Sequence, residues 1–115
     1  MQNNPLITAI VSTYNSELFF ENKIIDLLKQ TIADKLEIVI VNSGSKQRED
    51  EIIQPYLMAN NNIVYIRTNE RETIYAAWNR AVKASKGKYI TNSNTDDRLR
   101  KDALEILSEH LENNP

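Results

Sequence analysis

Cysteine is absent from this 115-residue sequence, so disulfide bonds, cysteine metal sites and a cysteine nucleophile are excluded. Only two glycines are present, and neither the GxGxxG nor the GxxxxGKS/T pattern occurs, which disfavours a Rossmann dinucleotide site and a P-loop. The G-x-S-x-G elbow of esterases is missing too. No apolar run approaches the roughly 20 residues of a transmembrane helix, and no signal peptide is visible. We therefore expect a cytoplasmic location, including the inner face of a membrane.

An excess of basic charge is also missing. The formal net charge is -2, so the chain has no basic field that would hold nucleic acid or an anionic membrane. Hydrophobic residues make up 41% of the sequence and charged residues 26%, which is typical of a globular protein. We expect residues 1–115 to form a single domain with a core of its own.

Apolar runs alternate with helical patterns along the chain. Four short apolar runs predict strands, and the first, residues 6–11, is rich in β-branched residues and suits a strand buried on both faces of a parallel sheet. Apolar residues at helical spacing between and after these runs predict helices. Such alternation predicts a mainly parallel, Rossmann-like sheet between two layers of helices, which is a three-layer αβα sandwich of the α/β class. The expected strands are residues 6–11, 36–41, 63–66 and 89–90, and the expected helices are about residues 17–31, 47–57 and 73–86, with a last helix through Leu104, Leu107 and Leu111.

Three residues predict details of the helix ends. Pro55 lacks a backbone N–H group and should bend or shorten helix 47–57. Thr73 is a suitable N-cap for the next helix. Gly87 follows that helix in the usual terminating position.

Right-handed crossovers place the carboxyl ends of all parallel strands at one edge of the sheet. The loops at that edge, residues 12–15, 42–45, 67–72 and 94–97, are the most polar in the chain, and the last contains Asp96 and Asp97. Carboxylates at such an edge suit a hard divalent cation and its phosphate ligand. The alternative is that the two acids open the next helix, whose N-terminal dipole favours them. The convergence of four polar loops favours the interpretation that the two acids bind a metal ion.

Other classes of protein with this fold lack the residues they need here. A response-regulator receiver domain needs acidic residues where this chain has Ser12 and Thr13, and an acceptor aspartate where it has Arg67. A nucleotidyltransferase would carry a glycine-rich, basic first loop. The ligand that remains is a phosphate compound bound through a cation held by carboxylates, such as a nucleotide sugar.

Four stretches of the chain match motifs of one known family in the right order. Residues 10–15 resemble an apolar strand that runs into a P/T-x-Y-N turn, and residues 37–45 resemble E-I-I-V-D-D-G-S. Residues 74–81 resemble a helix with A-x-N-x-G, and residues 87–98 resemble G-x-Y-I followed by D-x-D-D. Over nearly all of its length, the sequence therefore resembles the N-terminal, nucleotide-sugar-binding part of family 2 glycosyltransferases with the GT-A fold.

This resemblance implies roles for the matching residues. Asp96 and Asp97 would bind Mn²⁺ or Mg²⁺ that bridges the donor diphosphate. The donor would be a nucleoside-diphosphate sugar, a UDP-sugar in the first instance, and the acceptor a saccharide or a lipid-linked hydroxyl. The residues implied in nucleotide binding are Ser12, Thr13, Tyr14, Asn15, Asn42, Ser43, Asn79 and Asp96.

The sequence departs from the family pattern at several positions. Asn94 stands at the first acidic position of D-x-D, while Asn42 and Ser43 replace two aspartates. These side chains can still form hydrogen bonds but carry no charge. The departures therefore bear on which base the nucleotide carries more than on whether a metal ion binds. Arg67 and Arg71 could face a diphosphate or lie in solvent.

The general base of such a transferase is expected beyond Pro115, in an acceptor half that this chain does not include. We therefore expect a truncated domain of a hexosyl-type enzyme, which binds the donor but transfers nothing alone. The alternative is a non-catalytic α/β module for nucleotide or protein binding, in which Asp96 and Asp97 would be solvated and indifferent to metal.

Overall fold

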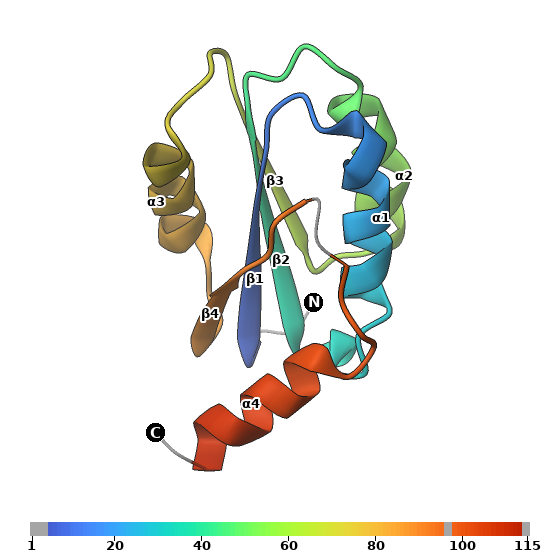
Figure 1. Ribbon diagram of the computed structural model, residues 1–115, viewed down its shortest axis with the longest axis vertical. Coiled ribbons are helices and arrows are strands. Elements are labelled where there is room, and N and C mark those ends of the chain that lie inside the picture. The colour runs from blue at the N-terminus through green and yellow to red at the C-terminus, as the bar shows by residue number, and fades with distance from the viewer. Residues whose placement is uncertain (1–4, 96–97, 114–115) are drawn as a thin grey trace.

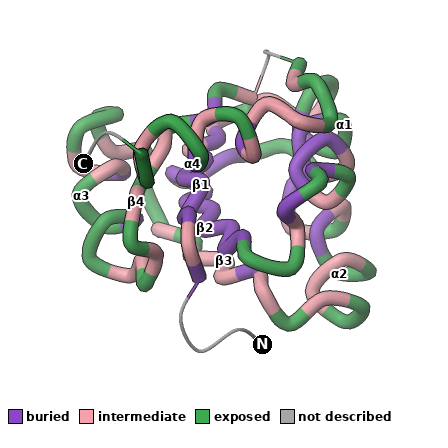
Figure 2. The backbone as a smooth tube through the Cα atoms, turned by 90° about the horizontal axis from the view of Figure 1, so that it is seen from below, coloured by how far each residue is buried: buried purple, intermediate pink, exposed green. Residues whose placement is uncertain are grey.

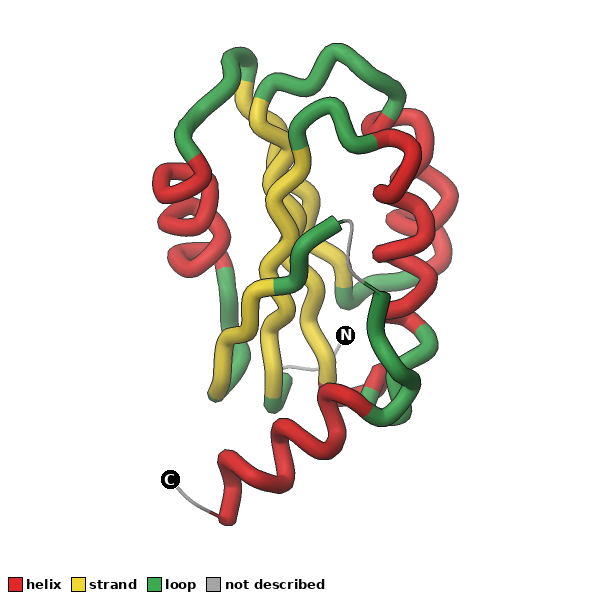
Figure 3. The backbone as a smooth tube through the Cα atoms, viewed as in Figure 1, coloured by secondary structure: helices red, strands yellow, loops and turns green. Residues whose placement is uncertain are grey.

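The computed structural model describes residues 5–95 and 98–113 as alternating strands and helices (Figures 1 and 3). The predicted order of elements is confirmed, and a short 3-10 helix is added before the second strand. In this part of the chain, no helix combines the length and the apolar character that crossing a membrane requires. The strands are β1 (Ile7–Thr13), β2 (Leu36–Ser43), β3 (Ile63–Thr68) and β4 (Tyr89–Asn92), and the helices are α1 (Glu17–Leu28), η1 (Ala33–Lys35), α2 (Glu49–Ala59), α3 (Ile74–Ala84) and α4 (Ala103–Asn113).

The sheet has the order β3-β2-β1-β4, and all its strand pairs are parallel, as predicted. β1 pairs with β2 along its whole length, up to Thr13 opposite Asn42. β4 pairs with β1 only as far as Asn92 opposite Ile10. The carboxyl ends of β1, β2 and β3 therefore share one edge, at the top of Figure 1, while β4 stops short of it.

Helices cover both faces of the sheet, which confirms the predicted three layers. α1 and α2 lie on one face and α3 on the other, while α4 crosses below the opposite edge (Figure 1). Because successive strand residues point to opposite faces, Ala9 and Val11 pack in the core with Ile24 of α1, whereas Ile10 packs with Ala77 of α3. Buried residues are concentrated in β1, β2 and the inner side of α1 (Figure 2).

A buried carboxylate joins the lower ends of β1 and β2 to the turn before β4. Glu37 accepts hydrogen bonds from the Thr8 hydroxyl at 2.8 Å and from the backbone N–H of Lys86 at 2.7 Å. The N–H of Gly87 donates to the same hydroxyl at 2.8 Å. A Cβ atom on Gly87 would lie 2.5 Å from the Thr8 backbone nitrogen. The expectation that Gly87 terminates the helix is wrong, because α3 ends at Ala84 and the glycine instead lets two backbones approach.

α1 holds the segment that follows β4. Asp26 is 7% exposed and accepts hydrogen bonds from the Arg98 guanidinium at 2.7 and 2.9 Å and from the Leu99 N–H at 3.2 Å. Gln30, two residues beyond the end of α1, accepts a further hydrogen bond from the Leu104 N–H at 3.0 Å. The Arg98 guanidinium holds the pKa of Asp26 below its ordinary value. These contacts, which we call the α1 clamp, fix the direction in which the chain leaves the sheet.

Pro55 does not shorten α2, which is one of the two effects that the sequence predicts for it. The helix continues to Ala59. The proline removes the N–H that would bond to the carbonyl of Glu51, but both residues are exposed, so water can satisfy that carbonyl. Thr73 does cap α3 as predicted, since its hydroxyl accepts from the Ala76 N–H at 3.1 Å.

The last helix bears on the two interpretations of the acid pair. α4 begins at Ala103, with residues 98–102 between it and Asp97. The interpretation that the acids open this helix is therefore wrong, because they lie outside its first turn.

We predict that Gly87→Ala lowers the free energy of unfolding by about 1–3 kcal/mol, because the added methyl group would overlap fixed backbone. Urea unfolding would measure this change. Lys86→Ala, which alters only an exposed side chain of the same turn, is the control and should change little. Equal midpoints for Gly87→Ala and the wild type would contradict the close backbone approach.

We predict that Asp26→Ala lowers the free energy of unfolding by about 1–2 kcal/mol at pH 7, because it leaves the Leu99 N–H and Arg98 without their acceptor. The folded pKa of Asp26 lies below the unfolded value of about 4. The difference in unfolding free energy between the variant and the wild type should thus have its full value above pH 4. It should decline as the pH falls through the folded pKa. Denaturant unfolding across this range, with exposed Asp34→Ala as control, would test it; a difference independent of pH would contradict the ionic contribution.

Candidate functional site

Three polar loops meet at the edge where β1, β2 and β3 end (Figure 1). The loop after β3 reaches the loop after β1, since the Arg71 guanidinium lies 4.3 Å from the centre of the Tyr14 ring. A cavity of about 140 Å³ opens beside this pair. It is lined by Ser12, Thr13, Tyr14, Ser43, Arg71, Glu72, Ile74 and Ala77.

This lining combines an aromatic ring, a permanent cation and several hydroxyl groups with the carboxylate of Glu72, which is paired with Arg80 at 2.6 Å. A guanidinium can form paired hydrogen bonds with phosphate or carboxylate oxygens, and an aromatic face can stack on a planar ring. The cavity is thus chemically suited to an anionic ligand with a planar group.

The loop that carries Arg71 is held by two small residues at the end of β2. Gly44 has a φ of +65°, and a Cβ atom there would lie 2.5 Å from the backbone of Glu70. The hydroxyl of Ser43 accepts a hydrogen bond from the Glu72 N–H at 2.5 Å. Because only glycine allows this approach, the turn after β2 decides where Arg71 lies.

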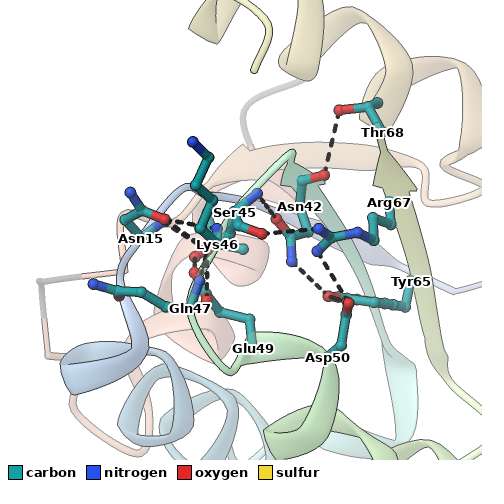
Figure 4. A network of polar contacts seen from close by, with 11 residues as sticks. Asn15, Asn42, Ser45, Lys46, Gln47, Glu49, Asp50, Tyr65, Arg67 and Thr68 are labelled. Atoms are coloured by element: carbon teal, nitrogen blue, oxygen red, sulfur yellow. Dashed lines mark hydrogen bonds and ion pairs between the residues drawn. The ribbon is translucent and has the colours of Figure 1, made fainter. Parts of the chain in front are cut away.

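Glu49, the first residue of α2, joins the loops after β1 and β2 (Figure 4). Its Oε2 accepts hydrogen bonds from the Thr13 hydroxyl at 2.9 Å and from the Ser16 N–H at 3.0 Å, and its Oε1 accepts one from the Ser45 hydroxyl at 2.7 Å. Burial alone would raise the pKa of Glu49, but these hydrogen bonds outweigh it and hold the pKa below its ordinary value. Glu49 is therefore a carboxylate at neutral pH.

Asn42 is fully buried, and its side chain is occupied within the protein (Figure 4). The amide oxygen accepts from the Ser45 N–H at 2.9 Å, and the amide nitrogen donates to the Tyr65 hydroxyl at 2.8 Å. Tyr65 in turn donates to Asp50. An aspartate at position 42 could not donate to Tyr65, which accounts for an amide at this position.

Arg67 belongs to the same network. Its guanidinium lies 3.0 Å from the carboxylate of Asp50 and donates to the Ser45 carbonyl at 2.8 Å. Burial and the hydrogen bond to Asp50 raise the pKa of Tyr65, which keeps its hydroxyl protonated at neutral pH. Of the two arginines that the sequence left equivalent, Arg67 is thus tied to α2 and the β2 turn, whereas Arg71 faces the cavity.

The other predicted site residues are more scattered. Asn15 is exposed beside the cavity loops, with its side-chain oxygen accepting from the Lys46 N–H at 2.9 Å. Asn79 is exposed on α3 and lines a separate, open hollow of about 570 Å³, which it shares with Arg80 and Lys83. Its role in nucleotide binding stays a prediction.

Asp96 and Asp97 lie outside the described residues. The chain before them is placed by the Ser93 N–H, which donates to the Ile10 carbonyl at 2.9 Å, and Asn94 is exposed. Within residues 5–95 and 98–113, no group of three or more histidine or acidic side chains is arranged to hold a metal ion. The metal site thus stays a prediction that rests on the two aspartates.

Two features of the site were missed by the sequence analysis. Glu49 reads as an ordinary acidic residue in the first turn of a helix, and no local pattern indicates that it reaches Thr13. The stacking of Arg71 on Tyr14 depends on how two loops fold toward each other, which the sequence does not display.

Comparisons with known proteins agree with this geometry. A family model described as glycosyl transferase family 2 matches residues 8–115. The uncharacterized glycosyltransferase EpsJ of Bacillus subtilis is 36% identical over 110 residues, which are 96% of this chain and 31% of EpsJ. The chondroitin synthase of Pasteurella multocida is 36% identical over 108 residues, 93% of this chain but 11% of that protein. The chain thus spans about a third or less of these two relatives.

Solved structures share the fold. TarS of S. aureus, crystallised in complex with UDP, superposes with a TM-score of 0.85 at 23% identity, covering 94% of this chain and 32% of TarS. The mannosyltransferase PcManGT of Pyrobaculum calidifontis, in complex with GDP-Man and Mn²⁺, has a TM-score of 0.80 at 23% identity and covers 96% of this chain and 32% of its own. The expected GT-A fold is therefore confirmed. With the family match over residues 8–115, the chain belongs to glycosyl transferase family 2.

Proposed function

We propose that this chain is the donor-binding part of a glycosyltransferase, which transfers a sugar from a nucleoside-diphosphate sugar to an acceptor hydroxyl. The observation that carries the proposal is the cavity between Tyr14 and Arg71, at the sheet edge of a family 2 domain. Ligands of open α/β sheets bind at this edge. UDP is the nucleotide that we propose first, and the UDP complex of the similarly folded TarS supports it.

In this proposal the described residues bind and orient the donor. Tyr14 offers its ring to the base, the Arg71 guanidinium neutralises negative charge on the ligand, and the hydroxyl of Ser12 directs its polar groups. Holding the nucleotide in one orientation lowers the entropy cost of reaching the transition state.

We also propose that Asp96 and Asp97 hold Mn²⁺ or Mg²⁺. The donor set fits such an ion, because carboxylates are the oxygen ligands that hard cations prefer. The next described helix, α4, begins only at Ala103. The ion would supply charge neutralisation at the leaving diphosphate. We propose that the acceptor site and the general base are contributed by residues outside this chain, so that the 115 residues alone bind the donor weakly and transfer no sugar.

Binding of nucleoside diphosphates would test the metal proposal. Calorimetry with UDP or GDP should detect binding that is stronger with Mn²⁺ than without, and the double variant Asp96→Ala/Asp97→Ala should weaken the Mn²⁺-dependent part by about tenfold or more. Asp34→Ala, at an exposed acid in η1, is the matched control. Binding that is equal with and without Mn²⁺ and in all variants would contradict the metal site and favour a non-catalytic module.

We further predict that Arg71→Ala raises the Kd for UDP by roughly five- to thirtyfold, because the cation is lost from the cavity. Arg100→Ala removes an equally charged, exposed side chain away from this cavity and should leave the Kd unchanged. Salt titration provides a second measurement, since the effect of Arg71→Ala should diminish as ionic strength rises. An unchanged Kd in Arg71→Ala would remove Arg71 from the proposed site.

A further inference from the structure

Glu49 is a fully buried carboxylate next to the proposed nucleotide site, yet it does not line the cavity. Its two oxygens serve different loops. Oε2 binds the loop after β1, through the Thr13 hydroxyl and the Ser16 N–H, and Oε1 binds the turn after β2 through the Ser45 hydroxyl. A single side chain thus fixes the spacing between two of the three loops that border the cavity.

The contacts extend to the residues between these anchors. The Ser45 hydroxyl also lies 3.0 Å from the Asn15 backbone nitrogen, which donates to it, and 3.1 Å from the Asn15 side-chain oxygen. Asn15 has a φ of 49°, a left-handed conformation that asparagine adopts more readily than most residues other than glycine. Tyr14 lies between Thr13 and Asn15, so the backbone on both sides of the Tyr14 ring is held through Glu49.

We propose that Glu49 is a positioning residue for nucleotide binding, which holds Tyr14 in the orientation that completes the cavity with Arg71. This inference rests on the proposed function, because it assumes that the cavity receives the nucleotide. Glu49 would not contact the ligand, so its effect on affinity is transmitted through Thr13, Ser16 and Ser45.

The chain contains a natural control for this proposal. Glu37, which lies in β2, is buried like Glu49. It likewise accepts hydrogen bonds from a threonine hydroxyl and a backbone N–H. Glu37 lies near the opposite end of the strand, by Thr8 and the turn before β4. Removing either carboxylate leaves buried donors without an acceptor and lowers stability. Only removal of Glu49 should also change the nucleotide site.

The test compares the Kd for UDP with Mn²⁺ in Glu49→Ala, Glu49→Gln and Glu37→Ala of the 115-residue chain. The temperature is chosen so that circular dichroism shows every variant to be folded. We expect the Kd to rise about tenfold or more in Glu49→Ala and to stay within about twofold of the wild type in Glu37→Ala.

Glu49→Gln separates hydrogen bonding from charge. The glutamine oxygen can accept from Thr13 and Ser16, but its NH₂ group cannot replace the acceptor of Ser45, whose oxygen already accepts from the N–H groups of Asn15 and Gln47. The Ser45 hydroxyl can turn its hydrogen toward the Asn15 side-chain oxygen, so this variant loses only one of the three contacts of Glu49. We therefore expect its Kd to lie between that of the wild type and that of Glu49→Ala. If Glu49→Ala does not fold, Ser45→Ala provides the same comparison, because it breaks the link between Glu49 and Asn15 and should raise the Kd several-fold.

Two results would overturn the inference: a wild-type Kd in folded Glu49→Ala or Ser45→Ala, or an equal loss of affinity in Glu37→Ala. Failure of the wild type to bind any nucleoside diphosphate would instead count against the proposed function. In that case, amide hydrogen exchange still tests whether Glu49 holds the loop after β1 in place. The Ser16 N–H should exchange faster in Glu49→Ala but not in Glu37→Ala, and unchanged exchange would overturn it.

Discussion

Parallel pairing between β1 and β2 is the constraint on which the rest of this structure depends. Ile7 opposes Leu36 and Thr13 opposes Asn42, so the two strands end at the same level. Both strands are buried on both faces, and a shift of one residue would turn every core side chain to the wrong face. The register thus places the two turns that border the cavity beside each other before any loop contact forms.

Buried carboxylates stabilise this pair at opposite ends. Glu37 joins the pair to the turn before β4, and Glu49 joins its upper end to two loops. A buried polar group is costly unless hydrogen bonds satisfy it, so each of these side chains requires its donors to keep their positions. Both oxygens of Glu49 accept hydrogen bonds, whereas only one oxygen of Glu37 does. At the lower end of the sheet these hydrogen bonds stabilise the fold, and at the upper end they fix the arrangement of the site. The turn after β2 contributes further, since Gly44 and Ser43 place the loop that carries Arg71.

The sequence was sufficient to predict the fold because the signals involved are local. The apolar runs around Val11 and Val39 are typical of strands, and the N-cap at Thr73 is indicated by the residues that follow it directly. The ends of elements were predicted less well, since exposure of Pro55 decides whether a helix tolerates it. The role of Gly87 depends on Thr8, 79 residues away, and that of Glu49 depends on Thr13, 36 residues away. Such partners appear only when the chain is folded.

The α1 clamp has a consequence for how this chain reaches its folded state. Asp26 and Gln30 meet partners 72 to 74 residues further along the chain, whereas β1 and β2 pair across a much shorter interval. Bringing such distant segments together costs more chain entropy, and this cost comes before the contacts repay it. The α1 clamp should therefore close late, after the central strands have collapsed, so that α4 is among the last elements to dock.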